Sequence, residues 1–450
     1  MKIAVAGTGY VGLITGVCLA EMGHQVICTD ILDEKIQLLK TGRSPIFEPG
    51  LEPMLKNNLL SGRLAFTVNP KIAYKDAEII FIAVGTPENH DGTSHLDYVH
   101  AAAYSIGICI ENDVIVCTKS TVPVGTNEKI KEIIQSVKPP PHQAEVVSNP
   151  EFLREGSAII DFFNGDRIIL GTNSKSAAAK LEELYLPLKI PIIKTDTRSA
   201  EMIKYASNAF LAAKISFINE IAAICEKTGA NIEEVAFGIG KDKRIGPYFL
   251  QAGIGYGGSC FPKDTKALVQ LAGNVQHKFE LLESVIKVNN RQQTLAVSLA
   301  KNVLGSLEGK RVALLGLAFK PDTDDVREAA SLMIAKRLLE NNASVIAYDP
   351  AAVPNARKVL GDAIEYTMNV QIALENADLA IIATEWEQIK HFPLELYTEK
   401  MKSPVIIDGR NCYSLREISR HSISYISIGR PYIIPDKIME GRLYENSFLH

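Results

Sequence analysis

The sequence predicts an α/β protein with two Rossmann-like, doubly wound parallel-sheet domains joined by a long central helical segment. Short apolar runs alternate with helical stretches from the N-terminus onward, and a similar alternation starts again near residue 310. The segment between the two series is patterned as helix. At 450 residues the chain has room for about three domains. We place them at 1–196, 197–305 and 306–450.

The first series opens with a β-α-β unit. Lys2–Ala6 and Gln25–Thr29 have the apolar pattern of short buried strands, and Val11–Met22 between them is patterned as a helix. Strands and helices that alternate in this way form a parallel sheet covered on both faces. Further strands are expected at Ile79–Val84, Val114–Thr118 and Glu145–Ser148.

The second series mirrors the first. Ala77–Ile80 and Ala377–Ala380 resemble each other locally and set the register between two related halves, although a shared architecture could converge on the same pattern. The expected strands of this half are Arg311–Leu315, Ser344–Tyr348, Leu379–Ala383 and Val405–Ile407, with a helix around Glu328–Glu340.

The central segment is poor in strand patterns. In Ser199–Lys227 and Phe279–Ser306 the apolar residues recur at steps of three and four, which is the period of an amphipathic helix. We expect a helical spacer here. A long helix between two α/β domains commonly also serves as a subunit interface, but the helical pattern by itself does not show one.

Charge and cysteine usage exclude several classes of protein. With 48 basic and 52 acidic residues the net charge is −4, which provides no basic field for a nucleic-acid partner. The seven cysteines include no C-x-x-C pair, so we expect neither a disulfide framework nor a metal site, and we expect a reducing cytoplasm. Ile3–Ala20 is uncharged, but its glycines and the lack of a cleavage site argue against a signal peptide or a membrane span.

The stretch Gly7–Gly12 (Gly-Thr-Gly-Tyr-Val-Gly) has the spacing of a dinucleotide-binding loop. It lies between an expected strand and helix, and Asp30 ends the next strand. Asp30 would accept hydrogen bonds from ribose hydroxyls and repel a 2′-phosphate, which favours NAD over NADP. Alternatively, the glycines only help a strand turn into a helix. The candidate cofactor residues in this loop are Gly7, Gly9, Tyr10, Val11 and Gly12.

The second half lacks these glycines, because Gly316–Pro321 (Gly-Leu-Ala-Phe-Lys-Pro) follows its first strand. It cannot cradle a dinucleotide in the same way. Lys320, Arg327 and Arg410 lie at or just beyond expected strand ends and could hold phosphates by charge. The alternative for each of them is ordinary solvated surface charge.

Cys260 follows a second glycine-rich stretch, Gly253–Gly258. Glycines cost backbone entropy on folding, so their expected use here is a close approach of the backbone to a ligand. Lys263 and Asp264 provide the polar and electropositive surroundings that a reactive Cys260 thiolate needs. We interpret Cys260 as a nucleophile and the other six cysteines as buried and inert.

Polar residues also interrupt the central helix and follow two strands of the first half. Lys204 and Asn208 are four residues apart and share a helix face, which is either buried with polar partners or simply exposed. The loops Thr118–Pro123 and Ser148–Gly156 place hydroxyls and carboxylates at one edge of the first sheet.

Taken together, these motifs resemble the UDP-glucose 6-dehydrogenase branch of the nucleotide-sugar dehydrogenases. The resemblance preserves motif order and spacing from residue 1 to about 435. In that family the first domain binds NAD, the helical segment forms the dimer, and the second Rossmann-like domain binds the UDP-sugar. The reaction is a four-electron oxidation of the sugar C6 alcohol to a carboxylate with two NAD. The other branches act on GDP-mannose or a UDP-N-acetylhexosamine, and a non-catalytic nucleotide-binding protein is a distant alternative.

The resemblance implies a role for each catalytic candidate. Cys260 would attack the aldehyde and pass through a thiohemiacetal and a thioester. Lys204 and Asn208 would stabilise oxyanion character at C6, and Glu151 would act as a base in thioester hydrolysis. Asp264 and Thr121 would organise a water molecule.

The resemblance also implies contacts to both nucleotides. Arg244 matches a residue that reaches the substrate of the partner subunit. The positions implied for NAD are Asp30, Lys35, Thr86, Thr121, Glu155, Lys263 and Arg327. Those implied for the UDP-sugar are Glu151, Phe152, Leu153, Arg154, Glu155, Lys204, Asn208, Phe249, Leu250, Gln251, Ala252, Gly253, Tyr256, Gly257, Lys320 and Arg410.

Overall fold

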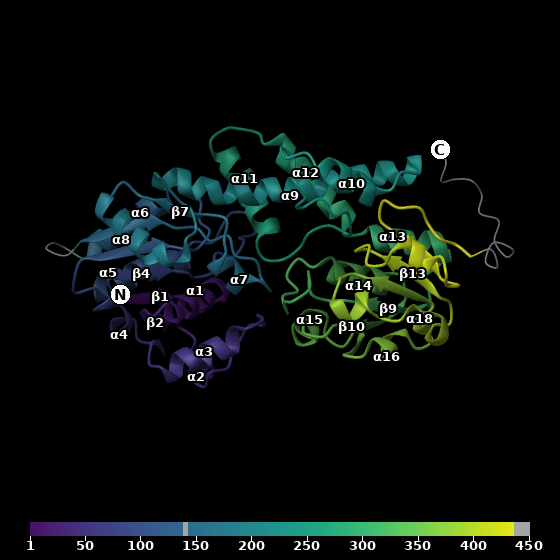
Figure 1. Cartoon of the computed structure of the whole chain (residues 1–450), viewed down its shortest axis with the longest axis horizontal. Coiled ribbons are helices and arrows are strands. Elements are labelled where there is room, and N and C mark those ends of the chain that lie inside the picture. Colours follow the sequence, from purple (N-terminus) through teal and green to yellow (C-terminus); the bar gives the residue numbers. More distant parts are fainter. Residues whose placement is uncertain (138–142, 436–450) are drawn as a thin grey trace. The chain divides into compact units, whose positions relative to one another are not determined.

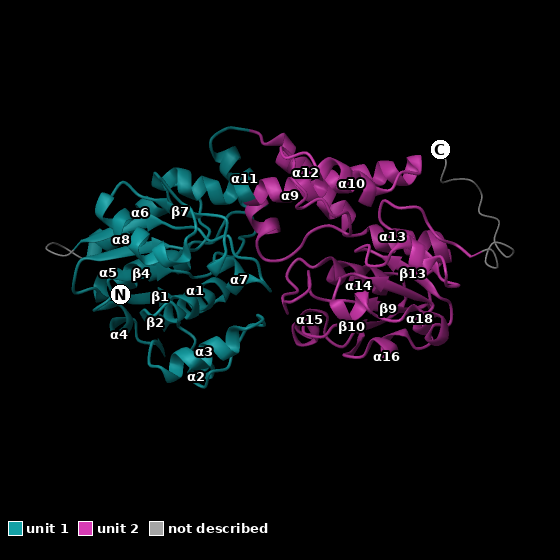
Figure 2. Cartoon of the chain, viewed as in Figure 1, with its two compact units in different colours: residues 1–207, 266–277 teal, residues 208–265, 278–450 magenta. Residues whose placement is uncertain are grey.

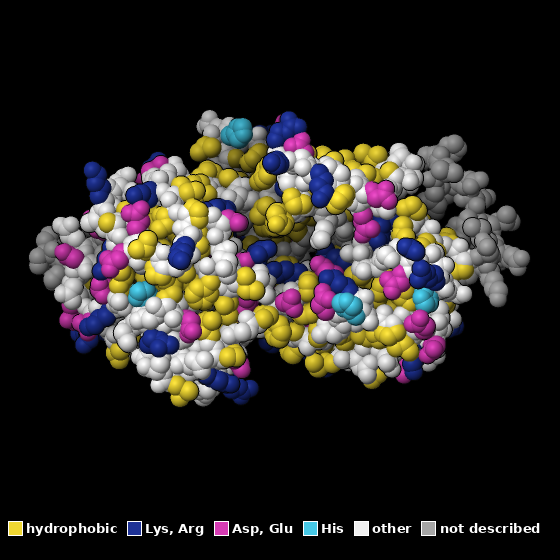
Figure 3. All heavy atoms as spheres, viewed as in Figure 1, with side chains coloured by type: hydrophobic (Ala, Val, Ile, Leu, Met, Phe, Trp, Pro, Cys, Tyr) yellow, Lys and Arg dark blue, Asp and Glu magenta, His cyan; other side chains and the backbone are white. Residues whose placement is uncertain are grey.

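The computed structural model describes residues 1–137 and 143–435 of the chain. These residues form two compact units (Figure 2). The first unit contains residues 1–207 and 266–277, and the second contains residues 208–265 and the described residues from 278 onward. Acidic and basic side chains are interspersed on the face shown in Figure 3, in keeping with the net charge of −4.

The first unit is built around an eight-stranded sheet of order β3-β2-β1-β4-β5-β6-β7-β8. Strands β1 to β6 are parallel, whereas β7 runs antiparallel to β6 and β8 pairs in parallel with β7. The strands are β1 Lys2–Ala6, β2 Gln25–Thr29, β3 Leu64–Thr67, β4 Ile79–Ile82, β5 Val114–Thr118, β6 Ala144–Ser148, β7 Ile168–Gly171 and β8 Ile192–Thr195.

Helices cover both faces of this sheet, as the side chains of β1 show. Ile3 and Val5 pack in one apolar cluster with residues of α1, and Ala4 and Ala6 pack in another with residues of α5. Alternating burial on two covered faces explains why the strand is apolar throughout. The helices are α1 Tyr10–Glu21, α2 Asp33–Lys40, α3 Leu51–Leu60, α4 Pro70–Tyr74, α5 Asp97–Cys109, α6 Thr126–Val137, α7 Ala158–Phe163, α8 Lys175–Tyr185 and the 3₁₀ helix η1 Leu186–Leu188.

The second unit contains a six-stranded parallel sheet of order β11-β10-β9-β12-β13-β14. The strands are β9 Arg311–Leu315, β10 Ser344–Tyr348, β11 Glu365–Thr367, β12 Leu379–Ile382, β13 Val405–Asp408 and β14 Ser424–Ser427. The helices that accompany it are α14 Ala330–Glu340, α15 Val353–Leu360, α16 Val370–Leu374, α17 Glu387–Lys390, α18 Leu394–Lys400 and α19 Leu415–Ile418.

The two sheets repeat one plan, as the sequence register predicts. The order of the second sheet matches that of β3 to β6 in the first. Asn69 caps α4 by accepting a hydrogen bond from the Lys71 N–H, and Asn369 caps α16 through the Gln371 N–H at the matching position. The predicted fold class of two parallel-sheet α/β domains with a long helix between them is confirmed.

Five further helices make up the remaining part of the chain (Figure 1): α9 Thr197–Thr228, α10 Ile232–Gly240, α11 Phe261–Asn274, α12 Glu280–Gln292 and α13 Leu295–Leu304. Helix α9 confirms the predicted Ser199–Lys227 helix. The predicted Phe279–Ser306 helix is two helices, α12 and α13, and α10 and α11 were not predicted.

Within the described residues, α9 is the one helix long and apolar enough to cross a membrane by length and composition. Its polar side chains, however, have partners inside the protein. Glu201 accepts hydrogen bonds from the backbone N–H groups of Gly125 and Asn127, and Asn219 accepts one from the Gly253 N–H. Core helices of this kind pass the same test of length and composition.

Candidate active site

The phosphate loop Gly7–Gly12 joins β1 to α1, and each of its glycines has a separate structural reason. Gly7 has a φ of +94°, and a Cβ there would lie 2.7 Å from the Ala83 carbonyl oxygen. A Cβ on Gly12 would lie 2.0 Å from the Gly7 carbonyl oxygen. A Cβ on Gly9 would meet no atom within 4 Å, so a ligand can approach the backbone at the N-terminus of α1. This arrangement fits a bound dinucleotide.

Asp30 follows β2 and lies beside the loop. Its Oδ2 accepts hydrogen bonds from the Thr8 N–H at 2.9 Å, the Thr8 hydroxyl at 2.7 Å and the Lys35 ammonium at 3.0 Å. Burial opposes ionisation of Asp30, but these hydrogen bonds and the charge of Lys35 outweigh it and lower the pKa of the carboxyl. A carboxylate held ionised at this place favours ribose hydroxyls and disfavours a 2′-phosphate, as the sequence predicts.

Two further predicted cofactor residues in the first unit contact each other. The Thr86 hydroxyl donates a hydrogen bond to the Thr121 carbonyl at 3.0 Å, which joins the ends of the loops that follow β4 and β5. Both loops leave the carboxyl edge of the sheet, where open α/β sheets bind ligands.

Glu151 and Lys204 form a buried ion pair in the first unit. The Lys204 ammonium lies 3.0 Å from Glu151 Oε1, and the two side chains are 5% and 6% exposed. The second carboxylate oxygen accepts a hydrogen bond from the Leu153 N–H at 2.6 Å. The Lys204 ammonium also lies 5.3 Å from the centre of the Phe152 ring. Of the two possibilities left by the sequence, the structure therefore shows Lys204 buried with a polar partner.

Lys119 is a buried cation that belongs to none of the roles expected from the sequence motifs. It follows β5, and its ammonium lies 5.6 Å from the centre of the Tyr185 ring. Burial lowers the pKa of Lys119 to about 8, although the charge of Glu151 acts in the opposite direction, and the charge of Lys204 lowers it further. A lysine directly after an apolar strand is the local signal that could have identified it.

We expect Lys119→Met to unfold at a higher temperature than the wild type at pH 7, with a smaller difference at pH 9. The folded-state pKa of Lys119, about 8, is below the ordinary value of 10.5, so between these values the unfolded chain binds more protons. The stability of the wild type therefore rises with pH in this window, by about 1 kcal/mol between pH 7 and 9, and the variant lacks this gain.

Thermal unfolding of both proteins at the two pH values measures this difference. Lys129→Met on the surface of α6 is the control, because the Lys129 side chain is 58% exposed. Parallel pH profiles for Lys119→Met and the wild type would contradict the expectation.

The second unit holds Asn208, Cys260 and Asp264. Cys260 is exposed and immediately precedes α11, and its Sγ lies 3.6 Å from the Ser259 hydroxyl. The N-terminus of a helix stabilises a nearby thiolate. Asp264 is 1% exposed and accepts a hydrogen bond from the Asn208 side-chain amide at 2.6 Å and another from the Lys263 ammonium.

The other cysteines differ from Cys260 in burial. Burial raises the pKa of the Cys28 thiol to about 12, and it also raises the pKa values of Cys18, Cys117 and Cys225. Cys412 is partly buried, and its thiol pKa is likewise raised by burial and by the charges of nearby carboxylates. Cys109 is buried. Cys260 is the one exposed thiol of the seven, all of which lie in the described residues.

The glycines of Gly253–Gly258 have close protein neighbours, which the sequence pattern does not reveal. A Cβ on Gly257 would lie 2.3 Å from the Glu328 carbonyl oxygen, and one on Gly253 would lie 2.7 Å from the Gly409 carbonyl oxygen. Asn289 fixes the loop further by accepting a hydrogen bond from the backbone N–H of Tyr256 and donating one to its carbonyl. A Cβ would thus meet backbone at Gly253 and Gly257, and it would meet the side chains of Asn289 and Phe319 at Gly255 and Gly258.

The predicted phosphate-holding side chains of the second unit have protein partners in this structure. The Arg410 guanidinium donates to the carbonyls of Ala383 and Gly255 at 2.9 and 3.1 Å. Arg327 is paired with Asp325 through both carboxylate oxygens. The Lys320 ammonium lies 5.7 Å from the centre of the Phe319 ring.

The remaining predicted substrate residues differ in exposure. Leu250, Ala252 and Tyr256 are buried, whereas Gln251 is exposed. Arg244 is 89% exposed and paired with Asp242.

The predicted catalytic residues are divided between the two units. Thr121, Glu151 and Lys204 belong to the first unit, and Asn208, Cys260 and Asp264 belong to the second.

The sheet of the second unit reuses the position of Asp30 for a different purpose. Asp349 follows β10 as Asp30 follows β2, but it is fully buried. It accepts hydrogen bonds from four backbone N–H groups and from the Trp386 indole. Gly316 has a φ of +100°, and a Cβ there would lie 2.4 Å from Thr384. Asp349 is therefore occupied by donors of its own domain, whereas Asp30 lies beside a loop that is open at Gly9.

Sequence models of one family match the chain along most of its length. The NAD binding domain of the UDP-glucose/GDP-mannose dehydrogenase family matches residues 1–189, the central domain matches 198–291 and the UDP binding domain matches 313–415. The chain belongs to the UDP-glucose/GDP-mannose dehydrogenase family. The phosphate loop and Asp30 lie in the NAD binding domain, and NAD is the cofactor of this dehydrogenase.

Relatives within the UDP-glucose/GDP-mannose dehydrogenase family cover nearly the whole chain. UDP-glucose 6-dehydrogenase YwqF of Bacillus subtilis is 56% identical over 97% of this chain and 99% of its own. A UDP-glucose dehydrogenase structure from Pyrobaculum islandicum is 40% identical with a TM-score of 0.90, covering 95% of this chain and 98% of its own. A UDP-D-ManNAc dehydrogenase structure from Pyrococcus horikoshii is 28% identical with a TM-score of 0.84, covering 96% of this chain and 99% of its own.

Proposed function

We propose that this dehydrogenase oxidises UDP-glucose to UDP-glucuronate with two NAD and one water, through a thioester on Cys260. The observation that carries the proposal is the exposed Cys260 thiol at the start of α11, which singles it out from the other cysteines. The UDP-glucose dehydrogenases among the relatives support the choice of substrate.

Each oxidation step removes a hydride from C6 and a proton from the oxygen bonded to C6. Bound NAD supplies the hydride acceptor. The Cys260 thiolate adds to the aldehyde carbon, and the resulting alkoxide carries the electron pair that forms the thioester when the second hydride leaves. Lys204 and Asn208 stabilise this alkoxide, Lys204 through its positive charge and Asn208 through its side-chain amide.

Hydrolysis then releases the product. Glu151 takes a proton from water as the hydroxyl adds to the thioester carbon, and the C–S bond breaks to return the Cys260 thiolate. The ion pair with Lys204 at 3.0 Å supports this role because it holds Glu151 near the charge that stabilises the alkoxide. Asp264 and Thr121 order the water.

The proposed division of labour follows the domains. Residues 1–196 bind NAD through the phosphate loop, Asp30, Lys35, Thr86, Thr121 and Glu155. Residues 306–450 bind the UDP moiety with Lys320 and Arg410, and 197–305 supply Cys260. The ranges of the three family models support this division.

A substrate panel with NADH stoichiometry tests the function. We expect two NADH per UDP-glucose and little turnover of GDP-mannose or UDP-N-acetylhexosamines. One NADH with released aldehyde would overturn the thioester route, and preference for another sugar nucleotide would overturn the substrate. NAD binding without turnover of any of these substrates would indicate a non-catalytic protein.

We also propose a cytoplasmic homodimer that forms through α9. Phe210, Phe217 and Ile224 on this helix are 68%, 55% and 55% exposed. Their seven-residue spacing places them in one stripe, and a stripe of large apolar side chains fits a second copy of the same helix. The thiol state of all seven cysteines supports the reducing compartment.

Phe217→Glu is expected to convert the dimer to a monomer in light scattering after size exclusion, because a carboxylate in an apolar seam is costly. Ile72→Glu on α4, where the side chain is 54% exposed, is the control and is expected to remain dimeric. A wild type that is monomeric at micromolar concentration, or a dimeric Phe217→Glu, would overturn the proposed interface.

A further inference from the structure

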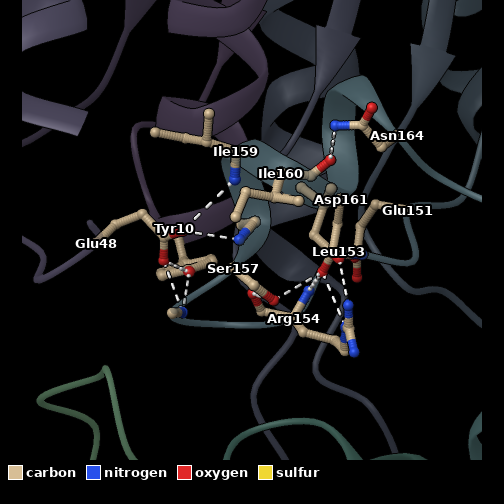
Figure 4. A network of polar contacts seen from close by, with 12 residues as sticks. Tyr10, Glu48, Glu151, Leu153, Arg154, Ser157, Ile159, Ile160, Asp161 and Asn164 are labelled. Atoms are coloured by element: carbon tan, nitrogen blue, oxygen red, sulfur yellow. Dashed lines mark hydrogen bonds and ion pairs between the residues drawn. The ribbon is translucent and has the colours of Figure 1, made fainter. Parts of the chain in front are cut away.

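Glu48 is a buried carboxylate with no part in the reaction proposed above. It lies between α2 and α3 and is 8% exposed. Its Oε2 accepts hydrogen bonds from the Tyr10 hydroxyl and, at 2.7 Å, from the Gly156 N–H (Figure 4). Its Oε1 accepts one from the Ala158 N–H at 2.7 Å. A single side chain therefore holds both the end of the loop after β6 and the start of α7.

Only a carboxylate satisfies all these donors. Both oxygens of Glu48 accept, and an amide has one oxygen acceptor and one NH₂ donor. In Glu48→Gln, an NH₂ group would therefore face either the Gly156 N–H or the Ala158 N–H. A buried donor that faces another donor costs the hydrogen bond and leaves a group unsatisfied.

Tyr10 connects this carboxylate to the phosphate loop. It follows Gly9 as the first residue of α1, and its hydroxyl accepts a hydrogen bond from the Gly156 N–H at 3.0 Å while donating to Glu48. Burial raises the pKa of Tyr10, and the hydrogen bond and charge of Glu48 raise it further, so the hydroxyl remains a donor at physiological pH.

The residues just before Gly156 are also fixed by hydrogen bonds, and one of these bonds reaches Glu151, the proposed base. The Arg154 backbone N–H and guanidinium donate to Asp161 of α7 at 2.8 Å and 2.6 Å. One residue earlier, the Leu153 N–H binds Glu151 Oε2. Figure 4 shows these side chains gathered around the segment from Glu151 to Ser157.

We propose that Glu48 and Tyr10 are positioning residues for the dehydrogenase reaction: they hold Gly156 and Ala158 so that the 151–157 segment presents Glu151 as the base for thioester hydrolysis. This inference rests on the role proposed for Glu151. Within the described residues, the Glu48 carboxylate accepts hydrogen bonds from the Tyr10 hydroxyl and from backbone N–H groups at 156–159. Loss of the carboxylate therefore acts first on the backbone around Gly156 and Ala158.

The test compares Glu48→Gln and Tyr10→Phe with Glu151→Gln. If the segment positions the base, hydrolysis slows and the thioester accumulates during turnover. We expect a fall of roughly tenfold or more in kcat for Glu48→Gln and a smaller fall for Tyr10→Phe, with a larger acylated fraction in intact-protein mass spectra than in the wild type. A purely structural role would lower the amount of folded enzyme without raising that fraction.

Exposed side chains of the same two types in the first unit provide matched controls. Glu52→Gln changes a carboxylate that is 47% exposed on α3, and Tyr104→Phe changes a tyrosine that is 53% exposed on α5. Both are expected to retain the wild-type kcat and acylated fraction. Tyr10→Phe removes one hydroxyl only, so it keeps the test decisive if Glu48→Gln does not fold.

The outcomes separate the two proposals. Normal hydrolysis in Glu151→Gln would overturn the role proposed for Glu151 and with it this inference. The positioning role alone would be overturned by a second result. In it, Glu151→Gln is defective in hydrolysis, but Tyr10→Phe and folded Glu48→Gln match the wild type in kcat and acylated fraction. A loss of kcat without additional acylated enzyme would overturn it as well.

Discussion

Cys260→Ala is expected to lose sustained NADH formation from UDP-glucose, by about 10³-fold or more, while NAD binding is unchanged. Without the thiolate, an aldehyde formed in the first step has no covalent attachment and no route to the thioester. The side chain is exposed, so its truncation leaves no buried cavity and the protein should remain folded.

Stopped-flow absorbance of NADH and calorimetric titration with NAD measure the two parts of this expectation. Cys412→Ala is the control, since burial and nearby carboxylates raise the pKa of the Cys412 thiol and keep it protonated. We expect this variant to turn over at the wild-type rate. An undiminished rate in Cys260→Ala would show that the nucleophile is misassigned.

Lys204→Met is expected to lower both kcat and stability. Removing the cation takes away the charge that stabilises the alkoxide, which is worth about 10²–10³-fold in rate. It also leaves Glu151, which is 6% exposed, buried without its ion-pair partner. Breaking such a pair typically costs about 3–5 kcal/mol, although the charge of Lys119 will offset part of that loss.

The double variant Lys204→Met/Glu151→Gln separates these effects. It removes both charges, so we expect the melting temperature to recover toward the wild-type value while kcat remains low. Thermal unfolding and steady-state kinetics of the two single variants and the double variant provide the comparison. Near-normal kcat in Lys204→Met would contradict the proposed role of the lysine.

The sequence was most informative where the signal is local. Strands such as Ile79–Ile82 are buried along their whole length, and the apolar run shows it directly. The missed strands β3, β7, β8, β11 and β14 are three or four residues long, and β8 and β11 have no fully buried residue. Runs of only three or four residues carry too little apolar pattern to be recognised.

The site contains residues that no local pattern reveals. Glu48 lies 108 residues from Gly156 and 110 from Ala158, and only folding brings these groups together. The glycines before Cys260 are different, because the sequence shows their pattern clearly but does not show its structural cause. Either a ligand or a neighbouring part of the protein can leave no room for a Cβ, and only the structure shows which neighbours are present.

Asp349 has a consequence for redesign of cofactor preference. Its carboxylate is saturated by five donors from its own domain, whereas Asp30 receives its hydrogen bonds within a loop that is open at Gly9. The same position after the second strand thus carries a buried structural carboxylate in one sheet and a partly exposed carboxylate beside the phosphate loop in the other. Changes that retune selectivity for the adenosine ribose can therefore be confined to the first copy, and the second can be left as scaffold.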